Sequence, residues 1–162
     1  MELLGFRVIA TGVFQYEFYS GKEQVCRVSG IVAPSAPVSM DGFGLKWKGE
    51  GERPTIMPGA FRRVFDEKGE TAARVIYRET GAYEIVLTKP MLSVSVRTMA
   101  GEHSFIMNGA PVGTMKRIAT SSWMPESNMG DVEPYWQVTL ADNLDARVVL
   151  IMLAFPMLRF AL

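Results

Sequence analysis

One histidine limits the acid–base chemistry that this chain of 162 residues could perform. A serine nucleophile needs a nearby imidazole as its base, so His103 would have to be that base. The candidate nucleophiles are Ser104, Ser121 and Ser122. The Gly-x-Ser-x-Gly turn that exposes such a serine in many hydrolases does not occur. His103 begins a strand-like run beside a turn, so we interpret it as a surface imidazole and expect no catalytic residue and no enzyme activity.

Acidic side chains stand close together at two places, Asp66–Glu67 and Glu50 with Glu52. Two carboxylates that face each other across a cleft could hydrolyse a glycosidic bond. Both pairs lie in turn-like or loop-like segments, which favours solvated charges instead. One histidine and one cysteine, Cys26, are too few for a nitrogen–sulfur metal site. We therefore expect no metal and no cofactor.

Basic residues are the remaining polar feature, and strand alternation could gather several of them on one outer face. Those in the strand-rich middle of the chain are Arg62, Arg63, Arg74, Arg78, Lys89, Arg97, Lys116 and Arg117. Guanidinium groups bind phosphate oxygens through charge-assisted, bidentate hydrogen bonds, so one interpretation is a site for an anionic group. The other interpretation is a solvated exterior whose cations pair with neighbouring acids. Because 17 basic residues balance 17 acidic ones, a general nucleic-acid binder is disfavoured.

The elements that must position these side chains read mainly as short strands. Turn signals recur at roughly 8–12 residues, which is typical of an antiparallel sandwich or barrel. The turns Asp66–Gly69 and Asn108–Gly109 are the clearest, since Asn-Gly is the preferred pair of a two-residue hairpin loop. Between Ala33 and Gly59 four prolines interrupt the pattern. We expect a long loop excursion there, with one short strand near Leu45–Lys48.

The C-terminal segment is apolar without a break over Val148–Phe155. We expect a helix over 142–162 with Asp142 as N-cap, kinked or ended by Pro156. Fifteen helical residues would span about 22 Å, short of the ~20 apolar residues that cross a bilayer. A helix that is apolar on every side must be buried on every side, so the strands should wrap around it. A buried strand is the alternative.

Three features in this order resemble the tubby C-terminal-like superfamily, with its LURP-one-related and phospholipid-scramblase branches. They are the strand–turn–strand Arg63–Ala73, the hairpin Phe105–Arg117 and the acidic lead-in to the apolar C-terminus, Asp142–Leu162. The resemblance covers roughly Phe61–Leu162. It implies a mainly β fold in one domain spanning 1–162, a closed antiparallel barrel of about twelve strands around a hydrophobic C-terminal α-helix.

The same resemblance implies a non-catalytic domain that binds anionic lipid headgroups or another membrane-surface partner through a basic groove. It places Lys116 and Arg117 at the anionic site, and Arg74, Arg78 and Arg97 are further candidates. The alternative is a protein-interaction or structural module with no small-molecule ligand, which binds a protein partner or a second copy of itself. A third hypothesis, a hydrolytic or ligand-binding barrel, requires an open lumen.

The location of the protein is expected to be cytoplasmic, with peripheral attachment at the membrane if the lipid hypothesis holds. A single cysteine fits a reducing compartment. Residues Met1–Arg7 carry an acid at Glu2 and no long apolar run, unlike a secretory signal peptide.

Overall fold

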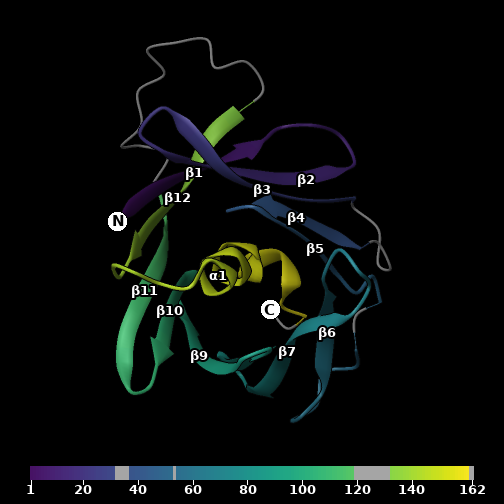
Figure 1. The fold of residues 1–162 in the computed structure, drawn as a ribbon. Helices are drawn as coiled ribbons and strands as arrows, with labels where there is room; N and C mark the ends of the chain where they lie inside the picture. The colour runs from purple at the N-terminus through teal and green to yellow at the C-terminus, as the bar shows by residue number, and fades with distance from the viewer. Residues whose placement is uncertain (32–36, 53, 119–131, 161–162) are drawn as a thin grey trace.

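The computed structural model describes residues 1–31, 37–52, 54–118 and 132–160. That part of the chain contains twelve β-strands and one α-helix (Figure 1). The strands are β1 (Glu2–Val8), β2 (Val13–Ser20), β3 (Glu23–Ile31), β4 (Val38–Gly42), β5 (Leu45–Gly49), β6 (Phe61–Phe65), β7 (Thr71–Glu79), β8 (Ala82–Thr88), β9 (Met91–Met99), β10 (Glu102–Met107), β11 (Ala110–Arg117) and β12 (Val132–Leu140). The helix is α1 (Ala146–Leu158).

A closed antiparallel barrel with the C-terminal helix inside it confirms the expected fold class. Each strand pairs with the next one along the chain, and β12 pairs with β1 to close the ring. Both expected turns are present. Gly69 donates its N–H to the carbonyl of Asp66 at 3.0 Å. Asn108 and Gly109 both have positive φ, at 53° and 76°, as a two-residue hairpin loop of type I′ requires.

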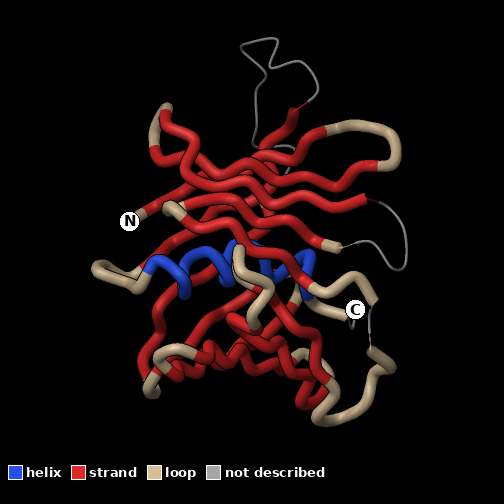
Figure 2. Tube along the Cα trace, turned by 45° about the vertical axis from the view of Figure 1, so that its right-hand side comes forward, coloured by secondary structure: helices blue, strands red, loops and turns tan. Residues whose placement is uncertain are grey.

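Helix α1 crosses the barrel interior, where strands surround it above and below (Figure 2). All residues from Val148 to Phe155 are at most 4% exposed, which is the burial expected of a helix that is apolar all round. At its start, Arg147 donates to the carbonyl of Lys89 in the β8–β9 turn. At its end, Met157 lies against Gly30 near the end of β3. We call these two openings of the barrel the entry rim and the exit rim.

The helix boundaries differ from the expected ones at both ends. Asp145 rather than Asp142 is the N-cap, and its carboxylate accepts the N–H of Arg147 at 2.9 Å. Helical geometry cannot begin earlier because Asn143 has a φ of +59°, outside the right-handed region. At the other end, the helix continues through Pro156 to Leu158.

Arg62 explains how the last turn of α1 is held despite Pro156. Arg62 is 1% exposed, and its guanidinium donates to the carbonyls of Met157 at 3.2 Å and Leu158 at 3.1 Å. These carbonyls lack partners within the helix, as the last four always do. Arg62 was among the basic residues expected on the outer face. It instead points inward, where it caps the C-terminal end of the helix.

The prediction of a long loop over Ala33–Gly59 is wrong for the middle of this range, which forms the hairpin β4–β5. Residues of β4 alternate between buried and exposed, and both strands continue the sheet. Gly42 permits the close approach of β4 to β3, since a Cβ there would lie 2.7 Å from the Val25 carbonyl oxygen. The short strand expected near Leu45–Lys48 corresponds to β5.

His103 is buried at 1% exposure, so the interpretation as a surface imidazole was wrong. Alternation along β10 places it on the inner face with Phe105. Its ring lies 5.1 Å from that of Phe155 and 5.5 Å from that of Trp136. The hydroxyl of Thr98 lies 2.8 Å from Nδ1 and satisfies one ring nitrogen, which makes burial of the polar ring tolerable.

The free energy of unfolding should decrease as the pH is lowered, because His103 is buried in its neutral form. Burial, and secondarily the charge of Arg159, lower the pKa of His103 from 6.5 to about 4. The unfolded chain therefore takes up a proton near pH 6.5 that the folded protein refuses until about pH 4. The contribution is present above pH 6.5 and is lost between these values, by about 3 kcal/mol in total. Urea unfolding across this range should show the slope in the native chain.

The matched variant for this prediction is His103→Gln, which keeps a hydrogen-bonding side chain but has no proton to bind. Its stability between pH 6.5 and 4 should change less than that of the native chain. An identical pH profile in both proteins would show that other groups cause the acid sensitivity.

Candidate functional site

Four of the five cations expected at an anionic site lie on β7, β9 and β11, and three of these four pair with an acid. Arg78 on β7 pairs with Glu84, with nitrogen and oxygen 2.5 Å apart, and Arg97 on β9 pairs with Glu79 at 3.4 Å. On β11, Lys116 lies 3.8 Å from Glu102. Arg74 lies over the ring of Phe61, 5.6 Å from its centre. Arg97 reaches Glu79, the residue after Arg78, so these two cations lie near each other and each is paired with an acid.

Arg117 differs from its neighbour Lys116 because adjacent strand residues face opposite sides of the sheet. It stands opposite Trp136 on β12, a residue with 4% exposure on the inner face. The guanidinium carbon of Arg117 lies 3.7 Å from the centre of the Tyr135 ring. No carboxylate of the described residues lies within ion-pair distance of Arg117.

A second guanidinium approaches the same tyrosine. Arg7 of β1 lies 4.8 Å from the Tyr135 ring centre and forms an ion pair with Glu133. It stands opposite Tyr16 of β2, whose ring is 5.2 Å from that of Tyr135. We call Arg7, Tyr16, Arg117, Tyr135 and Trp136 the arginine–aromatic cluster. It sits near the exit rim, where β11, β12, β1 and β2 run side by side.

A β-bulge makes this cluster, and for that reason sequence reasoning missed Arg7, Tyr16 and Tyr135. On β12, Trp136 pairs with Gly5 and Pro134 pairs with Phe6, so Tyr135 has no partner on β1. The bulge changes the direction of the Tyr135 side chain. As a result, the neighbouring residues Tyr135 and Trp136 both contact Tyr16, and the Trp136 ring lies 6.2 Å from the Tyr16 ring. Regular alternation predicts that the side chains of neighbouring residues diverge. Gly5 and Pro134 at the bulge are residue types found at such irregularities, but they do not give its position.

The cluster is rich in hydrogen-bond donors. Two guanidiniums and two phenols surround it, and Glu133 is the carboxylate paired with Arg7. Burial, then the neighbouring Tyr135, raise the pKa of Tyr16 far above its usual value, while Arg117 and Arg7 oppose the rise. The indole nitrogen of Trp136 is buried with no partner among the described residues. Such an orphaned donor is uncommon and marks a place where an acceptor would be stabilised.

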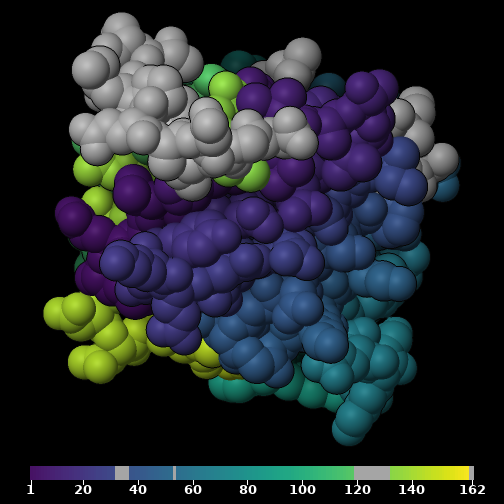
Figure 3. All heavy atoms as spheres, turned by 90° about the horizontal axis from the view of Figure 1, so that it is seen from above, coloured from purple at the N-terminus to yellow at the C-terminus, as the bar shows by residue number. Residues whose placement is uncertain are grey.

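Exposed apolar side chains adjoin the cluster at the exit rim. Val13 and Phe14 begin β2 opposite Ile31 and Gly30 of β3, and Ile9 lies in the turn before them. We call Ile9, Val13, Phe14 and Ile31 the apolar tip; their exposed fractions run from 37% to 67%. Figure 3 shows β1, β2 and β3 side by side as purple to blue bands. The apolar tip lies on or next to β2 and β3, and the cluster on β11, β12, β1 and β2, which are neighbours in the sheet.

The other residues singled out for chemistry have structural surroundings. Glu50 binds Arg63 at 2.9 Å, and these contacts lower the pKa of Glu50. Cys26 is buried, and burial raises the pKa of its thiol to about 12. The serines at 121 and 122 lie outside the described residues. Within the described ranges, no group of three His, Cys, Asp or Glu side chains could hold a metal ion, and no helix is long and apolar enough to span a membrane.

Comparisons of the chain with protein-family models, with curated proteins and with solved structures found no match. The geometry described above is therefore the basis for any functional conclusion.

Proposed function

We propose that this protein is a non-catalytic binding domain of tubby-like architecture that attaches to membrane surfaces by recognising an anionic lipid headgroup. The site is the arginine–aromatic cluster, with Arg117 as the principal cation. The observation that carries the proposal is the position of two guanidiniums around one tyrosine ring, next to four exposed apolar side chains.

The chemistry of a membrane surface fits this corner of the barrel. Headgroup phosphates accept charge-assisted hydrogen bonds from guanidinium groups, and the tyrosine ring holds those groups in place through cation–π contacts. Apolar side chains such as Phe14 enter the boundary between headgroups and acyl chains, while nearby cations interact with anionic lipid. The lumen is filled by α1, which supports a binding role at the rim rather than chemistry inside the barrel.

Vesicle sedimentation tests the proposal. The native protein should bind vesicles that contain anionic lipid more tightly than vesicles of phosphatidylcholine alone. Arg117→Ala should weaken binding to anionic vesicles about fivefold, because one basic residue near a charged surface contributes about 1 kcal/mol. Raising the salt concentration should shrink this difference through screening.

Two variants serve as controls. Arg78→Ala removes an exposed guanidinium that is paired with Glu84 on β7, away from the cluster, and should leave binding unchanged. Phe14→Ser should weaken binding by an amount that salt does not change, since its contribution is apolar. Equal loss for Arg78→Ala and Arg117→Ala would mean that net charge alone matters, and this outcome contradicts a specific site.

A protein-interaction module is the second candidate, favoured by the same apolar tip. Side chains such as Ile31, 67% exposed, could pack against a protein partner or a second copy of the chain. In that case light scattering should show a molecular mass that rises with concentration, and Phe14→Ser should abolish the rise.

A further inference from the structure

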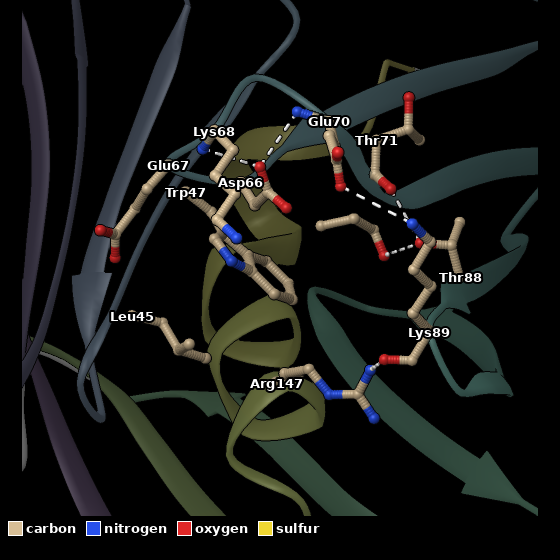
Figure 4. A pocket seen from close by; sticks show the side chains of 11 residues that line it. Leu45, Trp47, Asp66, Glu67, Lys68, Glu70, Thr71, Thr88, Lys89 and Arg147 are labelled. Carbon is tan, nitrogen blue, oxygen red and sulfur yellow. Dashed lines mark hydrogen bonds and ion pairs between the residues drawn. The ribbon is translucent and has the colours of Figure 1, made fainter.

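A cavity of about 370 Å³ opens at the entry rim, far from the arginine–aromatic cluster. Leu45 and Trp47 of β5 line one side, Asp66 and Glu70 of the β6–β7 turn line the top, and Arg147 lies opposite (Figure 4). This volume falls within the range of small-molecule sites.

The cavity exists because the barrel wall parts between β5 and β6. Only Lys48 and Gly49 of β5 pair with β6, at Phe65 and Val64, whereas every residue of β5 pairs with β4. Lys48 and Phe65 form the last pair between the two strands on the entry-rim side. After Phe65 the chain turns at Asp66, so Trp47 of β5 has no partner on β6 and lies at the gap. A second cavity of about 770 Å³ shares Trp47, Asp66 and Glu67 as lining residues.

Asp66 is held in a fixed orientation. Its Oδ1 accepts the backbone N–H groups of Lys68 at 2.9 Å and Glu70 at 3.0 Å, which is a local turn that locks the carboxylate. Oδ2 has no hydrogen bond or ion pair with the described residues and points into the cavity (Figure 4). The indole ring of Trp47 lies below it in the same view. A carboxylate oxygen and an aromatic face are the two groups that stabilise an organic cation.

Two of the three cations that line the cavity, Arg147 and Lys89, have partners, and the third is Lys68. The guanidinium of Arg147 binds Asp145 at 2.8 Å and the carbonyl of Lys89, and these contacts with Asp145 lower the pKa of that carboxyl. The ammonium of Lys89 lies 3.6 Å from Glu70. The carboxylate of Asp66 forms no ion pair with these two cations or with Lys68.

Trp47 adds a hydrogen-bond donor. It is 5% exposed, and its indole N–H has no hydrogen-bond partner among the residues that the structure describes. A ligand that carries an acceptor would satisfy this donor.

From these observations we infer that the entry-rim cavity binds a small organic ammonium ion that also carries a hydrogen-bond acceptor. Asp66 Oδ2 pairs with the ammonium group, the Trp47 ring covers it, and the indole N–H donates to the acceptor. An amino alcohol such as choline has this chemistry. The inference does not depend on the lipid site, because the two lie at opposite rims.

Titration of the ¹⁵N-labelled protein with choline chloride tests the inference. The indole N–H resonance of Trp47, assigned with Trp47→Phe, should shift to saturation, and the indole resonance of Trp136 should stay in place. Asp66→Asn keeps the oxygen that accepts the two backbone N–H groups but removes the charge. It should weaken choline binding about tenfold. Glu23→Gln, which removes an exposed carboxylate in the β2–β3 region, should not weaken it.

Two further ligands separate the parts of the inference. The uncharged isostere of choline, in which a tert-butyl group replaces the trimethylammonium group, should bind weakly. Tetramethylammonium, which has no acceptor, should bind more weakly than choline. An unsaturated or absent shift of Trp47, equal binding of the uncharged isostere, or unchanged affinity in Asp66→Asn would each overturn the inference.

Discussion

Replacing Phe155 with alanine is expected to lower the free energy of unfolding by about 3–5 kcal/mol, the usual cost of removing a buried phenylalanine. Phe155 lies at 0% exposure inside the barrel. Its ring contacts those of Tyr83 at 5.2 Å, His103 at 5.1 Å and Phe105 at 5.8 Å. These neighbours come from two strands, β8 and β10, and cannot all move into the space. Urea unfolding followed by circular dichroism measures the loss.

Two variants provide comparisons for this prediction. Phe155→Leu keeps most of the side-chain volume and should cost less than the alanine variant. Met91→Ala removes a side chain that is 76% exposed and should change stability by less than about 0.5 kcal/mol. If Phe155→Ala cost no more than Met91→Ala, α1 would not be packed in the lumen.

Arg62→Met should lower the free energy of unfolding by a similar amount, about 3–5 kcal/mol. The native guanidinium donates to the carbonyls of Glu50 at 2.6 Å, Met157 and Leu158. Methionine fills similar space but donates nothing, so buried carbonyls at the end of α1 lose their partners. Each unsatisfied buried group costs about 1–3 kcal/mol. Chemical unfolding at neutral pH measures the effect.

The neighbouring arginine is a matched control. Arg63 lies on the outer side of β6, where it pairs with Glu50 in solvent, and exposed pairs contribute little. Arg63→Met should therefore leave stability almost unchanged. Equal destabilisation by the two substitutions would mean that Arg62 acts through charge rather than as a cap of the helix.

The barrel and its central helix were predictable because two simple patterns determine them. Strand runs separated by regular turns favour an antiparallel sheet, and an apolar segment such as Val148–Phe155 needs burial on all sides. The hairpin β4–β5 was missed because prolines and glycines surround it. Its turn contains Phe43 at a φ of 54° before Gly44 at 78°. A bulky residue seldom adopts positive φ, so Phe43 did not suggest the first position of a hairpin turn.

Polar residues inside the barrel were beyond sequence reasoning, because their partners are distant in the chain. His103 is buried against Phe155 and Trp136, and Arg62 binds carbonyls about a hundred positions away. For the candidate site, charge alone identified Arg117, but its place opposite Trp136 follows from the pairing with β12. The approach of Arg7 and Tyr135 depends on a bulge that only coordinates reveal.

The order of elements along the chain has a consequence for biosynthesis. Helix α1 follows all twelve strands of the described residues, so a ribosome releases the wall before the segment that fills it. Until α1 emerges, the apolar inner faces of the strands have no partner to pack against and remain exposed to water. Nascent chains with such unfinished cores tend to aggregate. The domain can therefore reach its native state only after translation of its final helix, and chaperones have a defined interval in which to hold the incomplete wall.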